Sequence, residues 1–146
     1  MKSEPNCYSI DDLKNDNITH WDGVRNYQAR NMMRDQMKNK DLVFFYHSNA
    51  KPTGIVGVAE VCKEGYPDHT AFDPTSDHPD PSSDPDNPRW FMVDIKFKKK
   101  FKNIISLQEL KKIDFLKNMK LLQKGNRLSV MPITQQEWDF IQELSQ

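Results

Sequence analysis

The sequence predicts an α+β protein in which helices pack around a small twisted β-sheet or β-barrel. Segments with strand-like alternation and segments with helical periodicity follow one another without a regular strand–helix order. The chain has 146 residues and no internal repeat, which predicts one domain over residues 1–146. A chain of this length can bury a core without disulfide or metal staples.

Composition limits the classes of function. Lys plus Arg and Asp plus Glu each number 21, and this zero net charge argues against a protein that coats nucleic acid through bulk charge, although a locally basic cleft stays possible. No apolar run approaches the roughly 20 residues of a membrane span, and residues 1–6 lack a signal region. Cys7 and Cys62 allow one disulfide, but we expect a reduced interior.

Local signals define the first elements. After an extended piece at 7–10, Ser9 and Asp12 form a capping box for a short helix over 11–15. Asp22-Gly23 is a turn signal, and residues 25–38 predict a helix. On a helical wheel its apolar residues are Ala29, Met32, Met33 and Met37, and its polar face carries Tyr27, Arg30, Asn31 and Arg34.

Three strands are predicted over 41–47, 54–62 and 90–97. Gly57 and Ala59 share a strand face, which predicts the close approach of a helix or a ligand. Residues 64–89 are rich in Pro and Asp and too long for a passive connection, so this loop is either functional or mobile. The lysine run at 98–102 forms a basic edge that either guides a phosphate backbone or protects a strand edge.

The C-terminal third predicts mostly helix. Ser106 and Glu109 form a capping box for a helix over 107–113, and a second helix over 115–123 ends at Gly125. Residues 127–131 predict a short strand. Thr134 and Glu137 begin a last helix, whose apolar side carries Trp138.

Two unusual strings, 21–31 and 44–48, combine aromatic, amide and arginine side chains suited to a flat, hydrogen-bonding ligand such as a nucleobase. Aromatic rings stack on a base, and Asn or Arg reads its edge. The candidate walls are Trp21, Tyr27, Tyr46 and Trp90, and the candidate base-edge partners are Asn26, Ser3 and Ser48. The candidates for phosphate contacts are Arg25, Arg30, Arg127 and the backbone amides at Gly23-Val24. Val24 or Leu128 is the candidate lining of a niche for a methyl group.

Each candidate also has a structural alternative. Trp21, Tyr27, Tyr46 and Trp90 can be core or rim aromatics, and Arg30 and Arg34 a solvated face. A metal site built from His47, His69, His78, Asp68, Asp77 and Asp80 matches no compact ligand spacing. A Cys62–His47 nucleophilic pair is disfavoured because a cysteine among apolar strand residues is usually inert.

Several motifs together resemble the EVE domain family, and within it the thymocyte nuclear protein 1-like group. They are Lys2-Ser3-Glu4-Pro5, the whole 21–31 string, Phe45-Tyr46-His47-Ser48, Tyr66-Pro67-Asp68, Asp80-Pro81-Ser82-Ser83, Asp86-Asn87-Pro88-Arg89-Trp90 and Arg127-Leu128-Ser129. The resemblance runs nearly end to end. It implies a PUA-like β-barrel related to the YTH and ASCH domains, and a pocket for a modified nucleobase such as a modified cytosine, in DNA or RNA. On these motifs the site also includes His47 and Ser129.

We therefore predict a binding module, with no cofactor or metal, for nucleic acid that carries a modified base. Its base is held in a hollow formed by the Trp21-led segment and the polar side of the following helix, and Trp21→Ala should abolish binding while leaving the melting temperature nearly intact. The rival interpretations are an enzyme acting on nucleic acid or a nucleotide, and a protein–protein adaptor. We expect a monomer with no membrane association and no obligate protein partner. Because the chain begins at Lys2-Ser3-Glu4-Pro5 without a basic tail, we expect a bacterial cytoplasmic protein, or a nuclear one in a eukaryote.

Overall fold

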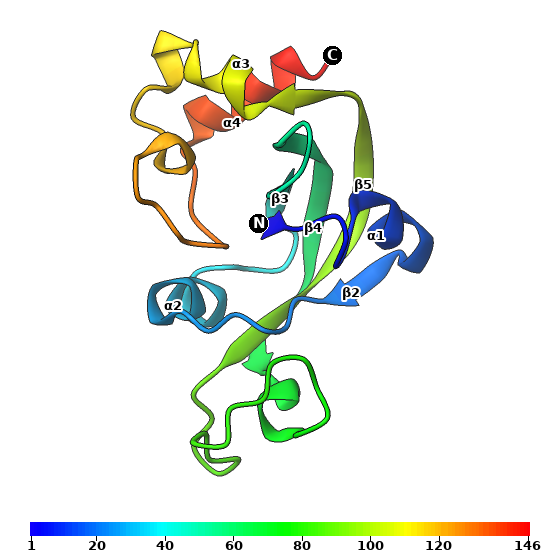
Figure 1. Cartoon of the computed structure of the whole chain (residues 1–146), viewed down its shortest axis with the longest axis vertical. Coiled ribbons are helices and arrows are strands. Elements are labelled where there is room, and N and C mark those ends of the chain that lie inside the picture. Colours follow the sequence, from blue (N-terminus) through cyan, green and yellow to red (C-terminus); the bar gives the residue numbers. More distant parts are fainter.

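A five-stranded mixed sheet forms the centre of the protein, with its strands in the order β1-β3-β4-β5-β2. The computed structural model describes residues 1–146 (Figure 1). The strands are β1 (Lys2–Ser3), β2 (Ile18–His20), β3 (Leu42–His47), β4 (Gly54–Pro67) and β5 (Phe91–Ser106). β1 is parallel to β3, and the other neighbouring pairs are antiparallel.

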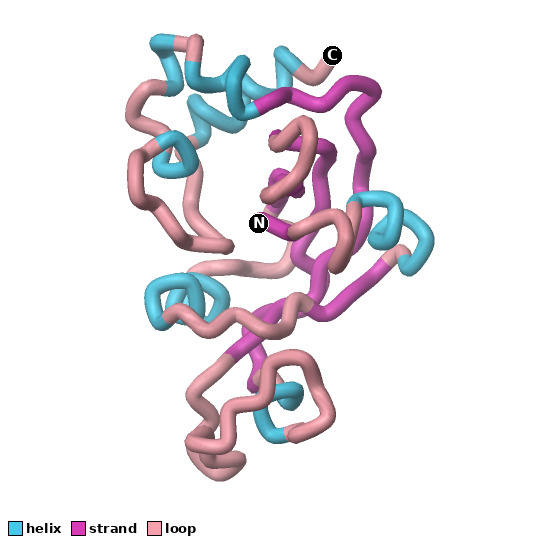
Figure 2. The backbone as a smooth tube through the Cα atoms, in the orientation of Figure 1, coloured by secondary structure: helices cyan, strands magenta, loops and turns pink.

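The sheet does not close, so the predicted barrel is wrong while the α+β class is confirmed. β1 and β2 lie at opposite edges of the sheet and do not pair with each other. They have only two and three residues, too few to form the ladder that would join the two edges. β4 and β5 are much longer and run through most of the molecule (Figure 2).

Four α-helices and three 3-10 turns surround the sheet. The helices are α1 (Ile10–Asp16), α2 (Tyr27–Asp35), α3 (Leu107–Lys111) and α4 (Gln135–Leu144), and the 3-10 turns are His69–Phe72, Asp114–Leu116 and Lys120–Leu122. The capping boxes at Ser9 and Thr134 are formed as predicted. Ser106 caps α3 by accepting from the amide of Glu109.

Alternation along β3 places its side chains on both faces of the sheet. Val43 and Phe45 join one buried cluster, which α1 and α2 cover, while Phe44 and Tyr46 join another, which α3, α4 and the segment between them cover. Four consecutive apolar residues at 43–46 are therefore all buried, as expected for a strand covered on both faces.

Gly57 confirms the predicted close approach on β4. A Cβ there would meet the backbone carbonyl oxygen of Lys99 on β5 and the side chain of Ile10 from α1. The approaching groups are thus a neighbouring strand and a helix.

Two segments differ from the predictions in the C-terminal third. Residues 115–123 form parts of two 3-10 turns, Asp114–Leu116 and Lys120–Leu122, instead of one helix. Residues 127–131 are not a strand; the carbonyl oxygen of Ser129 accepts one hydrogen bond from the amide of Lys2, 2.8 Å away.

The Pro- and Asp-rich loop forms a lobe at one end of the molecule, next to the segment that precedes α2 (Figure 1). Short side-chain-to-backbone turns stiffen it, since Asp73, Asp80 and Asp84 each accept from the amide two residues further on. This loop therefore has a defined conformation beside the predicted site.

Candidate functional site

The segment from Trp21 to Asn26 is fixed to the sheet at its start and caps a helix at its end. The Trp21 amide donates to the carbonyl oxygen of Val93 on β5, 2.8 Å away. Gly23 has φ +78°, in the region that favours glycine, which confirms the predicted turn. Asn26 is the N-cap of α2, and its side-chain oxygen accepts from the amide of Ala29 at 3.0 Å. The helix consequently starts at Tyr27, not Arg25.

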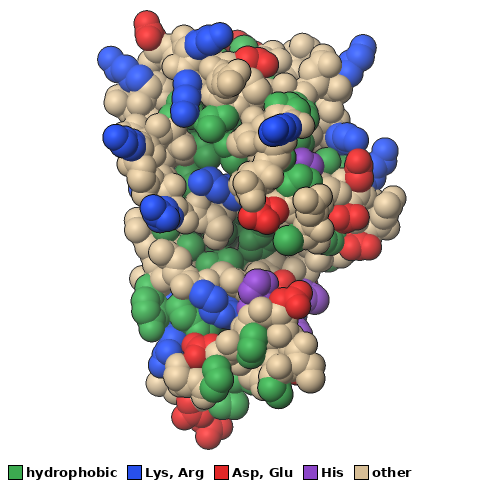
Figure 3. Space-filling view, in the orientation of Figure 1, with side chains coloured by type: hydrophobic (Ala, Val, Ile, Leu, Met, Phe, Trp, Pro, Cys, Tyr) green, Lys and Arg blue, Asp and Glu red, His purple; other side chains and the backbone are tan.

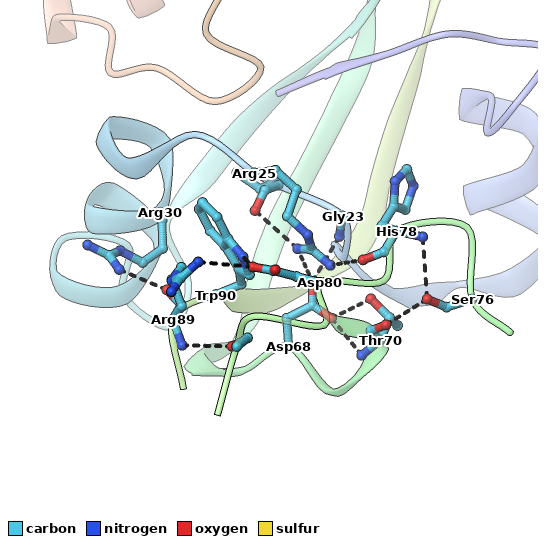
Figure 4. A network of polar contacts seen from close by, with 12 residues as sticks. Gly23, Arg25, Arg30, Asp68, Thr70, Ser76, His78, Asp80, Arg89 and Trp90 are labelled. Carbon is cyan, nitrogen blue, oxygen red and sulfur yellow. Dashed lines mark hydrogen bonds and ion pairs between the residues drawn. The ribbon is translucent and has the colours of Figure 1, made fainter. Parts of the chain in front are cut away.

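Asp68 ties this segment to the Pro- and Asp-rich loop (Figure 4). Its side chain is 0% exposed, and one carboxylate oxygen accepts from the Gly23 amide and from Arg25, each at 2.9 Å. The other oxygen accepts from the amide and the hydroxyl of Thr70, at 2.9 and 2.6 Å. Arg25 also donates to the carbonyl oxygen of His78. The carboxylate is fully satisfied, so it holds Arg25 and the turn in place.

Hydrogen bonding keeps this buried carboxylate ionised. Burial alone would raise the pKa of Asp68, but the hydrogen bonds from Thr70, Gly23 and Arg25 outweigh burial and hold the pKa below its ordinary value. The Arg25 side chain is 23% exposed, and its buried Nε has no hydrogen-bond partner.

Arginine and aromatic side chains alternate beside this ion pair. The guanidinium of Arg25 lies over the ring of Trp90, with 5.6 Å between them, and Trp90 stacks on Tyr27 with ring centroids 4.9 Å apart. Arg30 lies over Tyr27 at 4.9 Å and donates to the carbonyl oxygen of Arg89. The Trp90 indole donates to Asp80 at 2.6 Å. Trp90 is 6% exposed and Tyr27 is 53% exposed, so Tyr27 presents the accessible part of this stack.

Trp21 and Val24 belong to the core. Trp21 is 9% exposed and packs edge-on against Phe45, and both Trp21 and Val24 lie in the cluster beneath α2. The partly buried Leu128 packs against the same cluster. Because the Trp21 ring fills core space, the structure predicts that Trp21→Ala lowers the melting temperature, opposite to the sequence-based expectation.

Three more candidates, Ser3, His47 and Ser48, cluster where β1 meets β3, and they serve the fold. The Ser3 hydroxyl donates to the carbonyl oxygen of Tyr8, and the Ser48 amide donates to that of Ser3. Nε2 of His47 accepts from the amide of Ile10 at 3.1 Å, at the start of α1. Burial lowers the pKa of His47, which favours the neutral ring that this hydrogen bond requires.

Tyr46 lies on the other side of the sheet from Trp21. It lines an apolar cavity of about 480 Å³ between β3, residues 130–134 and α4. The structure therefore separates Tyr46 from the other predicted walls.

A polar cleft lies between the start of α2 and the loop that follows the last 3-10 turn. Its volume is about 420 Å³, and it contains three predicted residues, Asn26, Arg127 and Leu128. The sequence interpretation missed its other lining residues, which are Gln28, Lys120, Lys124, Gly125 and Asn126. In Figure 3, Lys and Arg side chains gather along the side of the molecule that this loop and α2 form.

A signal for the missed residues was present in the sequence. Residues 115–136 contain Lys117, Lys120, Lys124 and Arg127 but no Asp or Glu, next to the turn signal Gly125-Asn126. Such a segment in a neutral chain indicates a local basic surface.

The metal site that the sequence offered as an alternative is not formed. No group of three or more His, Cys, Asp or Glu side chains is arranged to hold a metal ion, and both cysteines are free. No helix combines the length and the apolar composition that a membrane span needs.

Comparison with known proteins gives matches over the whole of this chain. Thymocyte nuclear protein 1 from Mus musculus and from Homo sapiens are each 47% identical over 165 aligned residues, which cover 100% of this chain and 72% of theirs. A solved protein from Pseudomonas syringae has a TM-score of 0.96 and 45% identity, covering 100% of this chain and 97% of that one.

A further solved structure is that of human THYN1 in complex with DNA containing 5-methylcytosine. It has a TM-score of 0.93 and 47% identity, and covers 99% of this chain and 95% of that one. The sequence pattern of the EVE domain matches residues 1–144. With this match and these relatives, the resemblance seen in the motifs is confirmed, and the chain belongs to the EVE domain family.

Proposed function

We propose that this protein is a DNA-binding domain that recognises a modified cytosine, such as 5-methylcytosine, and that the polar cleft receives the modified nucleotide. The observation that carries the proposal is the complex of its human relative with DNA containing 5-methylcytosine, together with the similarity of fold over almost the whole chain.

The lining of the cleft supports this role. Its volume of about 420 Å³ lies in the range of small-ligand pockets. Asn26, Gln28 and Asn126 carry side-chain amides, which can both donate to and accept from a base edge. The Asn26 oxygen and both ends of the Asn126 amide serve the fold, whereas the Gln28 side chain makes no hydrogen bond in the protein. Gln28 is therefore the proposed reader of the base edge.

Leu128 supplies the apolar contact. It is the one hydrophobic residue among those lining the cleft, and it rests on the buried cluster that contains Trp21 and Val24. An aliphatic side chain against the 5-methyl group is how proteins commonly recognise that group. One buried methyl contributes about 0.8 kcal/mol, so the methyl alone gives a preference of roughly fourfold.

Tyr27 is the proposed aromatic contact. Of the four candidate walls it alone is largely exposed. Its ring stacks on Trp90 and does not line the cleft, so the proposed contact is with a base next to the modified one. Contact between a base and an aromatic ring contributes about 1–3 kcal/mol.

We propose a binding domain and not an enzyme. Two of the candidate acid–base groups are engaged in the fold: Asp68 accepts four hydrogen bonds, and His47 accepts from a helix amide.

The test compares fluorescence anisotropy titrations of two oligonucleotides that differ only in one cytosine or 5-methylcytosine. We expect roughly fourfold tighter binding of the methylated strand, and loss of this preference in Leu128→Ala. Leu144→Ala, which truncates an exposed leucine of α4, is the matched control. Equal affinity of the wild-type protein for both strands would refute the proposal.

A further inference from the structure

The loop opposite α2 carries charge that recognition of a base does not use. Lys120, Lys124 and Arg127 line the cleft, and no acidic side chain does. None of these three cations takes part in any of the five ion pairs of the protein. The cleft therefore has three uncompensated positive charges in a chain of zero net charge.

Backbone amides of the same loop also lack acceptors. The N–H groups of Lys124, Gly125 and Arg127 donate no hydrogen bond within the protein. Gly125 has φ +81°, and a Cβ at this residue would meet nothing within 4 Å, so the turn is open on that side. Successive free amides in a turn with a left-handed residue form a concavity that binds anions.

The loop is held in shape before any ligand binds. The side chain of Asn126 donates to the carbonyl oxygen of Lys120, 2.6 Å away, and accepts from the amide of Leu128 at 2.9 Å. These two bonds close the loop on itself. Neither uses the free amides or the cationic side chains.

We infer that this loop binds one backbone phosphodiester of the DNA strand, adjacent to the modified nucleotide. Lys120 and Lys124 supply point charges, Arg127 supplies a two-pronged donor, and the free amides complete the contact. The inference rests on the proposed function and adds the part of the ligand that positions the strand. Because phosphate contacts do not carry sequence information, the subsite acts equally on methylated and unmethylated strands.

The test removes the phosphate charge and the protein charge separately. Single methylphosphonate linkages, which are uncharged, are placed in turn on either side of the 5-methylcytosine in a single-stranded oligonucleotide. Affinity is measured for the wild-type protein, for Lys124→Gln, for Arg127→Gln and for the variant with both. Lys117→Gln is the matched control, because Lys117 is an exposed lysine of the same segment that does not line the cleft. All substituted residues are exposed, so melting temperatures should be unchanged.

We expect one methylphosphonate position to weaken wild-type binding about tenfold, and the double variant to lose this sensitivity. Each phosphate contact removed should also reduce the slope of log affinity against log salt by roughly 0.7. These effects should be the same for cytosine and 5-methylcytosine strands.

Two results would overturn the inference. One is that the double variant binds the oligonucleotide as tightly as the wild-type protein does. The other is that a methylphosphonate has no effect on wild-type binding at any position. If the wild-type protein does not prefer the methylated strand while the cation variants still bind both strands more weakly, the proposed function fails and the phosphate subsite stands. If the wild-type protein binds neither strand, both fail.

Discussion

Replacing Asp68 by alanine should strongly destabilise the protein, although the substitution removes only a small side chain. The change deletes a carboxylate that is 0% exposed and leaves Gly23, Arg25 and Thr70 without their acceptor. Removing one partner of a buried ion pair costs about 3–5 kcal/mol. Since Arg25 is 23% exposed and water can partly solvate it, we expect a loss near the lower end, about 3 kcal/mol. For a chain of this size that corresponds to a fall of roughly 10 °C in melting temperature.

Asp73→Ala is the matched control for this experiment. Asp73 accepts from the amide and the hydroxyl of Thr75, at 2.9 and 2.6 Å, as Asp68 does from Thr70, but Asp73 is exposed and has no arginine partner. Its replacement should cost much less than that of Asp68, because water solvates the exposed partners that it leaves. Urea unfolding followed by circular dichroism at pH 7 gives the two values. Equal losses for Asp68→Ala and Asp73→Ala would refute the role of burial and of the Arg25 pair.

The pH dependence provides a second measurement of the same contact. The folded-state pKa of Asp68 is lowered, so its stabilising contribution is complete above the unfolded-state pKa near 3.9 and is lost as pH falls through the folded-state value. Wild type should therefore lose its advantage over Asp68→Ala below about pH 4. An advantage that stayed constant as the pH falls below about 4 would contradict this assignment.

Three other substitutions test separate parts of the structure. Trp21→Ala should lower the free energy of unfolding by about 3–5 kcal/mol in urea titrations, because it empties core space, and a melting temperature near that of wild type would restore Trp21 as a pocket residue. The lowered pKa of His47 means that its contribution is present above the unfolded-state pKa of about 6.5 and falls as pH drops below it. His47→Gln should therefore flatten the stability profile below about pH 6.5; an unchanged slope would show that the Ile10 contact does not depend on a neutral ring. Gly57→Ala should destabilise the protein by about 1–3 kcal/mol in thermal melts, because the carbonyl of Lys99 is backbone and cannot move aside, and a neutral effect would contradict the close packing of β4 and β5.

Elements with strong local signals could be predicted, and elements that depend on distant partners could not. The capping boxes at Ser9 and Thr134 determine where α1 and α4 start, since cap and helix lie within four residues. β1 and β2 have two and three residues, and they exist because β3 and β5 pair with them. No short sequence window contains that information. Closure of the sheet into a barrel depends on the same edge strands, β1 and β2, which is why the barrel prediction was wrong.

The same division holds for the candidate site. The 21–31 string correctly indicated a turn and a polar helix face, but it could not tell which aromatic side chain is exposed. Trp21 is buried because Phe45 lies beside it, and Trp90 is buried because Tyr27 covers it. The partner across the cleft, residues 120–128, is separated from Asn26 by more than 90 residues of sequence, so only the folded chain could bring it to the site.

The positions of the three tryptophans give the protein a built-in set of optical reporters. Trp138 stacks on Phe44 in the cluster under α4, Trp21 packs on Phe45 on the opposite face of the sheet, and Trp90 lies beneath Tyr27 beside Arg25. Quenching at Trp90 can therefore follow the arrival of a ligand near Tyr27, while the emission of the other two reports whether each half of the interior is intact. Unlabelled variants in which one tryptophan at a time is replaced by phenylalanine can thus separate occupancy from unfolding.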